Sequence, residues 1–254
     1  GARGLVGSSI YETLLKKGYK DILKPTRGEL DFRCQSDVKD YLSENKPEFI
    51  FIAAAKVGGI KANNDQRAEF IYDNIIIQSN IIHNAYLAGV KKMIFLGSSC
   101  IYPKEAPQPI KEESLLDGKL EITNEGYALA KIAGLKLCQY YNQEFNKDFI
   151  SVMPSNLYGP FDNFDPEKSH VLGSLLRKIY TAKTTKKENI EIWGSGIPRR
   201  EFLFVDDLAD ALCFLVKNYT NANPINVGTS KDISINELAA LISNIFSYPV
   251  KLVH

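Results

Sequence analysis

Short apolar runs alternate with longer amphipathic stretches through the first 150 residues of the chain. The apolar runs predict buried β-strands at residues 21–23, 49–52, 92–96 and 149–153. Apolar positions at helical spacing predict helices over residues 5–17, 38–44, 68–88 and 125–145. Gly18 and Gly89 stand where helix C-caps are expected. Strands that alternate with helices predict βαβ units, and therefore an α/β fold with a doubly wound parallel sheet.

After Pro160 the regular alternation of strands and helices gives way to a turn-rich segment, residues 161–166. Helices are expected at residues 170–182, 206–216 and 235–245, and short strands at 190–193, 202–205 and 224–228. We interpret residues 1–160 as a Rossmann-like nucleotide-binding domain. Residues 161–254 would form mainly a smaller, substrate-binding lobe that closes over it, with residues 200–217 or so returning to the first domain.

Composition excludes several kinds of partner. The formal net charge of +1 gives no electrostatic case for nucleic acid or an anionic membrane. No apolar run approaches the ~20 residues that a membrane-spanning helix needs. Widely spaced cysteines without a Cys-x-x-Cys pair argue against a metal site or a disulfide framework, and fit a cytoplasmic protein. These cysteines are Cys34, Cys100, Cys138 and Cys213.

Both ends of the chain have unusual features. The first residue, Gly1, is the first glycine of a turn that normally follows a central strand of a doubly wound sheet. The last residues, 250–254, include an apolar run that stops abruptly. We therefore expect the chain to be a fragment, with the first strand and a C-terminal part missing.

A glycine-rich turn opens the chain at Gly1, Gly4 and Gly7. In such a turn the first glycine permits the tight bend, the second lets the backbone approach a pyrophosphate, and the third allows close helix packing. The N-terminus of the helix that follows offers free N–H groups to the anion. The pattern predicts dinucleotide binding, although glycines also serve as plain turn formers.

Two arginines favour NADP over NAD. Proteins that bind NAD usually place an acidic residue about 20 positions after the glycine turn, where it bonds the ribose 2′-hydroxyl. Here Arg27 occupies that place, and Arg3 lies within the turn itself. Guanidinium groups suit a 2′-phosphate because they bind phosphate in a bidentate manner. Solvated surface arginines are the alternative. Asp31 is a candidate for the adenine edge.

Tyr127 and Lys131 are four residues apart, so on a helix their side chains share one face. A free tyrosine has a pKa of roughly 10, and a neighbouring cation is expected to lower it toward neutrality. Ser98 and Ser99 follow a buried strand, at the sheet edge where α/β proteins bind ligands. They would therefore touch a substrate oxygen beside Tyr127, or else merely cap the strand. The pattern favours an oxidoreductase.

Together these motifs resemble the extended short-chain dehydrogenase/reductases. More narrowly, the chain resembles the GDP-L-fucose synthase family in strings at residues 53–60, 97–103, 151–160, 169–171 and 193–196. The match covers nearly the whole chain. Members of that family convert GDP-4-keto-6-deoxy-D-mannose to GDP-L-fucose. They epimerise C3 and C5 and then reduce C4 with NADPH.

The resemblance implies a catalytic role for five residues. Tyr127 would protonate the C4 oxygen, Lys131 would bond the nicotinamide ribose and tune Tyr127, and Ser98 would hold the C4 oxygen. Cys100 and His170 match the family's base and acid for epimerisation. A thiolate is a competent base where a cation lowers its pKa, and imidazole titrates near neutrality. The alternatives are an inert buried cysteine and a surface histidine.

The resemblance also implies contacts to cofactor and substrate. Besides the glycines and arginines above, NADP would lie against Leu5, Val6, Leu96, Gly97, Ser99, Lys131, Pro154, Asn156, Leu157 and His170. The GDP-sugar would contact Lys178, Trp193 and Arg200. Trp193 as a core residue and Lys178 as a solvated one are the alternatives. Homodimer formation through the helix bearing Tyr127 is a further implication.

Other functions on the same fold make different demands. A dehydratase would carry an acidic pair after the catalytic serine, where Ser99, Cys100 and Ile101 stand. A simple C4 epimerase has no use for Cys100 with His170. A non-enzymatic NADP-sensing protein would not need Tyr127, Lys131 and Ser98 together. The expected function is therefore epimerisation and reduction of a GDP-sugar.

Overall fold

The computed structural model describes residues 1–165 and 169–254. At its centre lies a parallel sheet with the strand order β1-β2-β3-β7. Its strands are β1 (Phe49–Ile52), β2 (Lys92–Leu96), β3 (Asp148–Pro154) and β7 (Ile225–Val227). Every residue of β2 is buried, as expected for a parallel strand that is covered on both faces.

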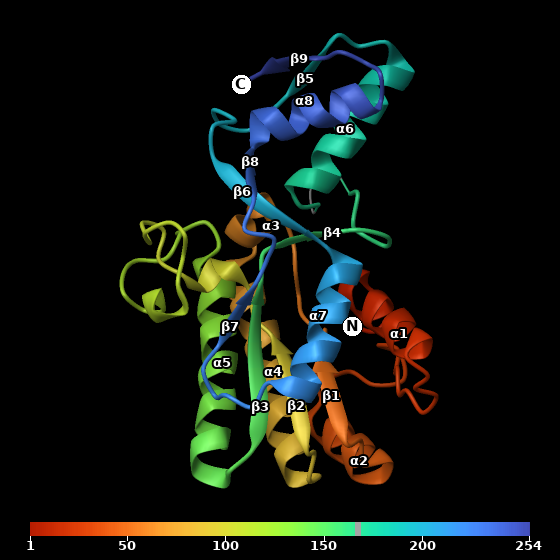
Figure 1. The fold of residues 1–254 in the computed structure, drawn as a ribbon, viewed down its shortest axis with the longest axis vertical. Helices are drawn as coiled ribbons and strands as arrows, with labels where there is room; N and C mark the ends of the chain where they lie inside the picture. The colour runs from red at the N-terminus through yellow and green to blue at the C-terminus, as the bar shows by residue number, and fades with distance from the viewer. Residues whose placement is uncertain (166–168) are drawn as a thin grey trace.

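Helices cover both faces of this sheet (Figure 1). On one face α4 packs against α5 and α2, and on the other α1 packs against α7. Successive side chains of β2 alternate between the two layers: Met93 and Phe95 join one apolar cluster, while Ile94 and Leu96 join the other. These helices are α1 (Leu5–Lys16), α2 (Gln35–Asn45), α4 (Arg67–Leu87), α5 (Glu125–Phe145) and α7 (Val205–Asn218).

The C-terminal elements build a second layer above the carboxyl ends of the strands (Figure 1). There α6 packs against α8 around a third apolar cluster, and β6 connects this region to α7. Strand β6 pairs with β4 and β8, and β5 pairs with β9. The elements are β4 (Asn156–Tyr158), α6 (Val171–Thr185), β5 (Asn189–Glu191), β6 (Arg199–Phe204), β8 (Asp232–Ser234), α8 (Ile235–Ile245) and β9 (Lys251–Val253).

Three short helical segments complete the chain: α3 (Ile60–Asp65) and the 3₁₀ turns η1 (Ser99–Ile101) and η2 (Glu112–Ser114). η1 directly follows β2, so it lies at the carboxyl edge of the sheet. No helix in the described ranges is both long enough and apolar enough to cross a membrane.

The predicted parallel α/β fold is confirmed. β1, β2, α5 and α8 have the predicted bounds, and Gly18 and Gly89 adopt positive φ values of 88° and 76° just after α1 and α4. The strand expected at residues 21–23 is wrong, because that segment has no neighbouring strand among residues 1–165 and 169–254 with which to pair. Three-residue strands such as β4 and β8 escaped prediction because so few residues carry no periodicity.

Candidate active site

The glycine turn packs tightly under the carboxyl end of β1. A Cβ atom on Gly1 would lie 2.1 Å from the Ala53 carbonyl oxygen, and one on Gly7 would lie 2.1 Å from the carbonyl oxygen of Gly1. A Cβ on Gly4 would meet only the Gly1 oxygen, at 3.5 Å. No side chain caps the N-terminus of α1, which begins at Leu5 and Val6. The backbone around Gly4 is therefore open to a pyrophosphate, and these residues fit a dinucleotide.

The charged side chains near this turn differ in whether they already have a hydrogen-bond partner. Arg3 and Arg27 are both exposed. Asp31, in contrast, accepts hydrogen bonds from Arg33, at 3.0 Å to Nε and 2.6 Å to Nη2. These hydrogen bonds, together with a bond from the Arg33 backbone N–H, lower the pKa of Asp31 to about 2. An adenine base would have to share the Asp31 carboxylate with Arg33, whereas both other guanidinium groups are available to an anion.

Tyr127, Lys131, Ser98 and Cys100 come together at the carboxyl end of β2. Lys131 is buried on α5, and its ammonium donates to the carbonyl oxygen of Leu96 over 2.8 Å and lies 5.6 Å from the Tyr127 ring centre. The hydroxyl of Ser98 accepts the N–H of Cys100 over 3.4 Å. Cys100 interacts electrostatically with both Tyr127 and Lys131. The sequence motifs therefore converge on one site.

Burial controls the ionisation of this cluster. It raises the pKa of Tyr127, and the neighbouring Cys100 raises it further. The expectation that Lys131 would bring that pKa toward neutrality is therefore wrong, because burial dominates and the phenol keeps its proton at neutral pH. Burial also raises the pKa of Cys100 to about 11, although the Ser98 side chain and Lys131 act in the opposite direction. The pKa of Lys131 itself is lowered to about 8 by burial.

Sequence reasoning missed several residues that fix this cluster from α4. Phe70 contacts the Tyr127 ring edge-on, with ring centres 6.4 Å apart. Gln78 donates to the Ala130 carbonyl oxygen over 2.5 Å, one residue before Lys131. Asn74 bonds both the N–H and the carbonyl oxygen of Lys56. Asn74 and Gln78 are polar residues four apart, on either side of the apolar run 75–77, and that spacing was the available signal.

The remaining predicted cofactor contacts lie beside the same sheet edge. Gly97 and Pro154 are buried, and a Cβ on Gly97 would lie 2.3 Å from the Met153 sulfur, so the chain passes very close to β3 here. Ser99 is exposed in η1. Asn156 and Leu157 begin β4 and are half-buried, with the Asn156 amide donating to the carbonyl oxygen of Glu201.

His170 lies at the start of α6, in the upper layer. It forms the N-cap position of α6 and is exposed. The surrounding chain nonetheless desolvates the ring enough to lower the pKa of His170, against an opposing effect of Asp162. Within the described part of the chain, no hydrogen bond joins it to Cys100.

The predicted substrate contacts lie on the upper layer. Trp193 is 63% exposed, so it is not a core residue. The ammonium of Lys178 donates to the carbonyl oxygen of Glu191 over 2.8 Å, at the end of β5 and two residues before Trp193. Arg200 is exposed on β6, and its guanidinium donates to the carbonyl oxygen of Arg199. An aromatic face and two cations are thus presented on one lobe.

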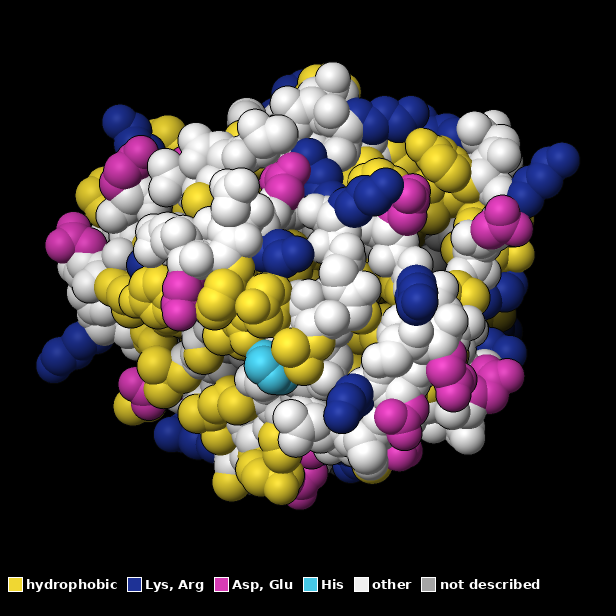
Figure 2. All heavy atoms as spheres, turned by 90° about the horizontal axis from the view of Figure 1, so that it is seen from below, with side chains coloured by type: hydrophobic (Ala, Val, Ile, Leu, Met, Phe, Trp, Pro, Cys, Tyr) yellow, Lys and Arg dark blue, Asp and Glu magenta, His cyan; other side chains and the backbone are white. Residues whose placement is uncertain are grey.

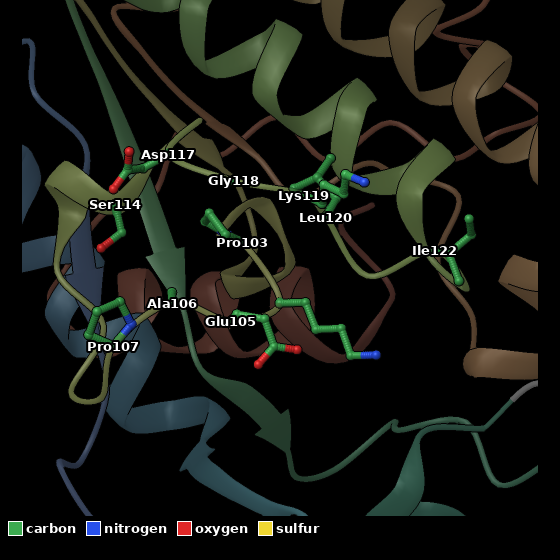
Figure 3. Close-up of a pocket in the computed structure, with 11 residues that line it drawn as sticks. Pro103, Glu105, Ala106, Pro107, Ser114, Asp117, Gly118, Lys119, Leu120 and Ile122 are labelled. Carbon is green, nitrogen blue, oxygen red and sulfur yellow. The ribbon is translucent and has the colours of Figure 1, made fainter.

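A cavity of about 550 Å³ lies within the loop that follows η1 (Figure 3). It is lined by Pro103, Lys104, Glu105, Ala106, Pro107, Ser114, Asp117, Gly118, Lys119, Leu120 and Ile122. None of the predicted site residues lines it. Across the described ranges, no cluster of His, Cys, Asp and Glu has the arrangement of a metal site. The expected site therefore lies at the sheet edge rather than in this cavity.

The fold and the glycine turn define a dinucleotide-binding class of α/β enzyme, and comparison with known proteins agrees with this class. Residues 1–228 match the NAD dependent epimerase/dehydratase family, so the chain belongs to that family. It is 53% identical over 253 residues to "Putative GDP-L-fucose synthase 2" of Arabidopsis thaliana, covering 100% of this chain and 77% of that protein. It is 47% identical to the Escherichia coli GDP-L-fucose synthase, covering 100% of this chain and 82% of the relative.

A solved structure of a GDP-L-fucose synthetase from Naegleria fowleri bound to NADP superposes with a TM-score of 0.90. It is 32% identical, and the match covers 100% of this chain and 78% of that one. The sequence resemblance and the structural resemblance therefore lead to the same family.

Proposed function

We propose that this chain converts GDP-4-keto-6-deoxy-D-mannose to GDP-L-fucose by epimerisation at C3 and C5 and reduction at C4. The assignment follows from relatives at about 50% identity over the full chain. One observation within the site supports it most directly. The phenol of Tyr127 and the thiol of Cys100 interact at a sheet edge that also carries Ser98. A single bound sugar can therefore contact both the Tyr127 phenol, as an acid, and the Cys100 thiol.

NADP is the cofactor, and NADPH when bound supplies the hydride for C4. The residues of the chain do the rest of the reduction. Ser98 holds the C4 oxygen by a hydrogen bond, and Tyr127 gives that oxygen a proton, so that the carbonyl becomes a hydroxyl. A phenol whose pKa is raised by burial is protonated at neutral pH, which suits a proton donor. Lys131 lies beside Tyr127, where its ammonium can donate a hydrogen bond to a ribose hydroxyl of the cofactor and help to return a proton to Tyr127.

Epimerisation exchanges a proton on the carbon atoms next to the C4 carbonyl. Cys100 removes the proton at C3 and at C5, and His170 returns one from the opposite face of the sugar. The Cys100 thiol is protonated at neutral pH because burial raises its pKa to about 11. Lys131 and the Ser98 side chain act to lower that pKa, which favours the thiolate that proton removal requires.

In this proposal the lower layer binds the cofactor and the upper layer binds the GDP-sugar. Residues 1–160 hold NADP through the glycine turn, Arg3 and Arg27. Residues 161–254 hold the GDP-sugar, with Trp193 against the base and Lys178 and Arg200 on the diphosphate, while about 200–217 return to the first domain. Lys178 lacks the bidentate fork of an arginine, so its contribution is a point charge.

We also propose a homodimer packed through α4 and α5. Both helices expose large apolar side chains, including Tyr72 (64%), Leu129 (43%) and Tyr140 (57%). Figure 2 shows apolar side chains gathered on the lower end of the molecule, where these helices end at Leu87 and Phe145. Replacing Tyr140 with Lys should shift the sedimentation coefficient to that of a monomer. The four cysteines are free, which supports a reducing compartment such as the cytoplasm.

Turnover of the keto-sugar tests the proposed function. Purified protein is mixed with NADPH and GDP-4-keto-6-deoxy-D-mannose in D₂O, and both NADPH oxidation and the mass of the product are followed. Deuterium at C3 and C5 together with a C4 hydroxyl supports the proposal. C4 reduction without deuterium would mean a simple reductase, and NADPH binding without turnover would mean a sensor; either result overturns it.

A further inference from the structure

The turn η1, which carries Cys100, is held by hydrogen bonds at both of its ends. At its start, Gly97 donates its N–H to the carbonyl oxygen of Val152 over 2.8 Å, which ties η1 to β3. Its end is Tyr102, the C-cap residue of η1, whose N–H bonds the carbonyl oxygen of Ser99. η1 is a single 3₁₀ turn with few bonds of its own, so the position of Cys100 depends on these two attachments.

Tyr102 is held from outside the turn. Its ring is 4% exposed and belongs to the main apolar cluster. Its hydroxyl donates to Oδ1 of Asn226 over 2.6 Å. Burial and the nearby Glu112 raise the pKa of Tyr102 to about 12, so this hydroxyl remains a donor at all working pH values. A buried hydroxyl that loses its partner is costly, which makes this bond a firm attachment.

Asn226 connects Tyr102 to three other segments. It lies on β7, opposite Met153 of β3. Its side-chain amide donates to the carbonyl oxygen of Ile110 over 3.3 Å, and its backbone N–H donates to Oε1 of Glu112 over 2.8 Å. One asparagine therefore joins the sheet, the loop after η1 and the turn η2 to the residue that ends the Cys100 turn. Such a fully bonded network holds one geometry.

We propose that Tyr102 and Asn226 are positioning residues that set the place of the Cys100 thiol relative to the sugar. The proposal rests on the proposed function, in which that thiol is the epimerisation base. Neither residue touches the reacting atoms; each acts through the backbone of η1. Tyr127 is carried by α5, and Ser98 directly follows Gly97, whose bond to the Val152 carbonyl oxygen stays in place when the Tyr102–Asn226 bond is lost. Loss of the Tyr102–Asn226 bond should therefore harm proton exchange at C3 and C5 more than C4 reduction.

Three variants test this inference: Tyr102→Phe, which removes only a hydroxyl, Asn226→Leu, which keeps the side-chain size, and the double variant. Each single change should slow deuterium entry at C3 and C5 by at least about tenfold, because small misplacements of a catalytic group are costly. The share of C4-reduced sugar that was never epimerised should rise. The double variant should be no slower than the worse single variant, since both changes break the same bond.

Tyr248→Phe is the matched control. It removes a hydroxyl that donates to the Lys187 carbonyl oxygen beside the third apolar cluster, and no bond among the described residues joins it to η1, Glu112 or Asn226, so deuterium entry should be unchanged. Losses that multiply in the double variant, or an equal fall of exchange and reduction with a lower Tm, would overturn the inference. If the wild-type protein itself shows no turnover of the keto-sugar, the proposed function has failed instead, and the two failures are distinct.

Discussion

The ammonium of Lys131 donates a hydrogen bond to the carbonyl oxygen of Leu96 over 2.8 Å. This bond spans α5 and β2, so it fixes the helix that bears Tyr127 against the strand that leads to Ser98 and Cys100. One buried cation thereby joins both halves of the site. Its own pKa is lowered to about 8 by burial, while the neighbouring Cys100 side chain acts in the opposite direction.

Tyr127→Phe should abolish proton donation to the C4 oxygen. General acid catalysis typically contributes about 10²–10⁴-fold, so NADPH oxidation should slow by that order. The NADPH dissociation constant, measured by fluorescence titration, should change little. Tyr19→Phe, which removes a hydroxyl from a residue 44% exposed, should leave the rate unaltered. Full activity of Tyr127→Phe would remove this residue from the mechanism.

Cys100→Ser should block proton exchange while sparing reduction. A hydroxyl is a far weaker base than a thiolate, so solvent deuterium should no longer enter C3 and C5 of the sugar. Mass spectrometry of the product checks this, and a C4-reduced sugar that was never epimerised is the expected side product. Cys213→Ala, on α7, is the control. Deuterium entry at the wild-type rate would assign the base to another residue.

Arg27→Asp should move cofactor preference from NADPH toward NADH. The carboxylate would repel the 2′-phosphate and could bond a free 2′-hydroxyl. The ratio of kcat/KM for the two cofactors measures the shift. The same charge change at exposed Lys39, on α2, controls for net charge and should leave the ratio unchanged. An unaltered ratio in Arg27→Asp would locate the 2′-phosphate elsewhere.

Two glycines of the first turn should respond differently to alanine. A Cβ at Gly7 would lie 2.1 Å from the Gly1 carbonyl oxygen, so Gly7→Ala should destabilise the fold by about 1–3 kcal/mol and weaken NADPH binding. At Gly4 the nearest atom would be 3.5 Å away. Gly4→Ala should therefore keep the wild-type Tm and lose only NADPH affinity. Equal stability losses in both variants would contradict this distinction.

Alkylation of Cys100 should depend on pH in the ligand-free protein. Burial raises its pKa to about 11, so only a small fraction is thiolate at pH 7. The rate of iodoacetamide labelling, followed by peptide mapping, should rise steadily from pH 7 toward 11, well above the ~8.5 midpoint of a free thiol. Because the charge of Lys131 lowers this pKa, Lys131→Met should raise it and slow labelling at any given pH. A midpoint near neutrality would be inconsistent with a buried thiol.

The local pattern of the sequence was sufficient for much of the fold. Glu125–Phe145 and Lys92–Leu96 were predicted with their observed bounds, because apolar spacing and buried runs depend on neighbouring residues. The segment at residues 21–23 shows the limit of such reasoning. Its apolar residues resemble a strand, yet a strand forms only where another strand offers a ladder, and that partner is a tertiary fact.

The sequence by itself identified the groups to which we assign the chemistry: a glycine turn, a tyrosine and lysine four residues apart, and a serine and cysteine after a buried strand. Only the tertiary structure decided their ionisation, because desolvation depends on atoms far away in sequence. It raised the pKa of Tyr127 where spacing alone predicted a fall. It also joined Tyr102 to Asn226 across 124 positions of chain, a link that no local pattern encodes.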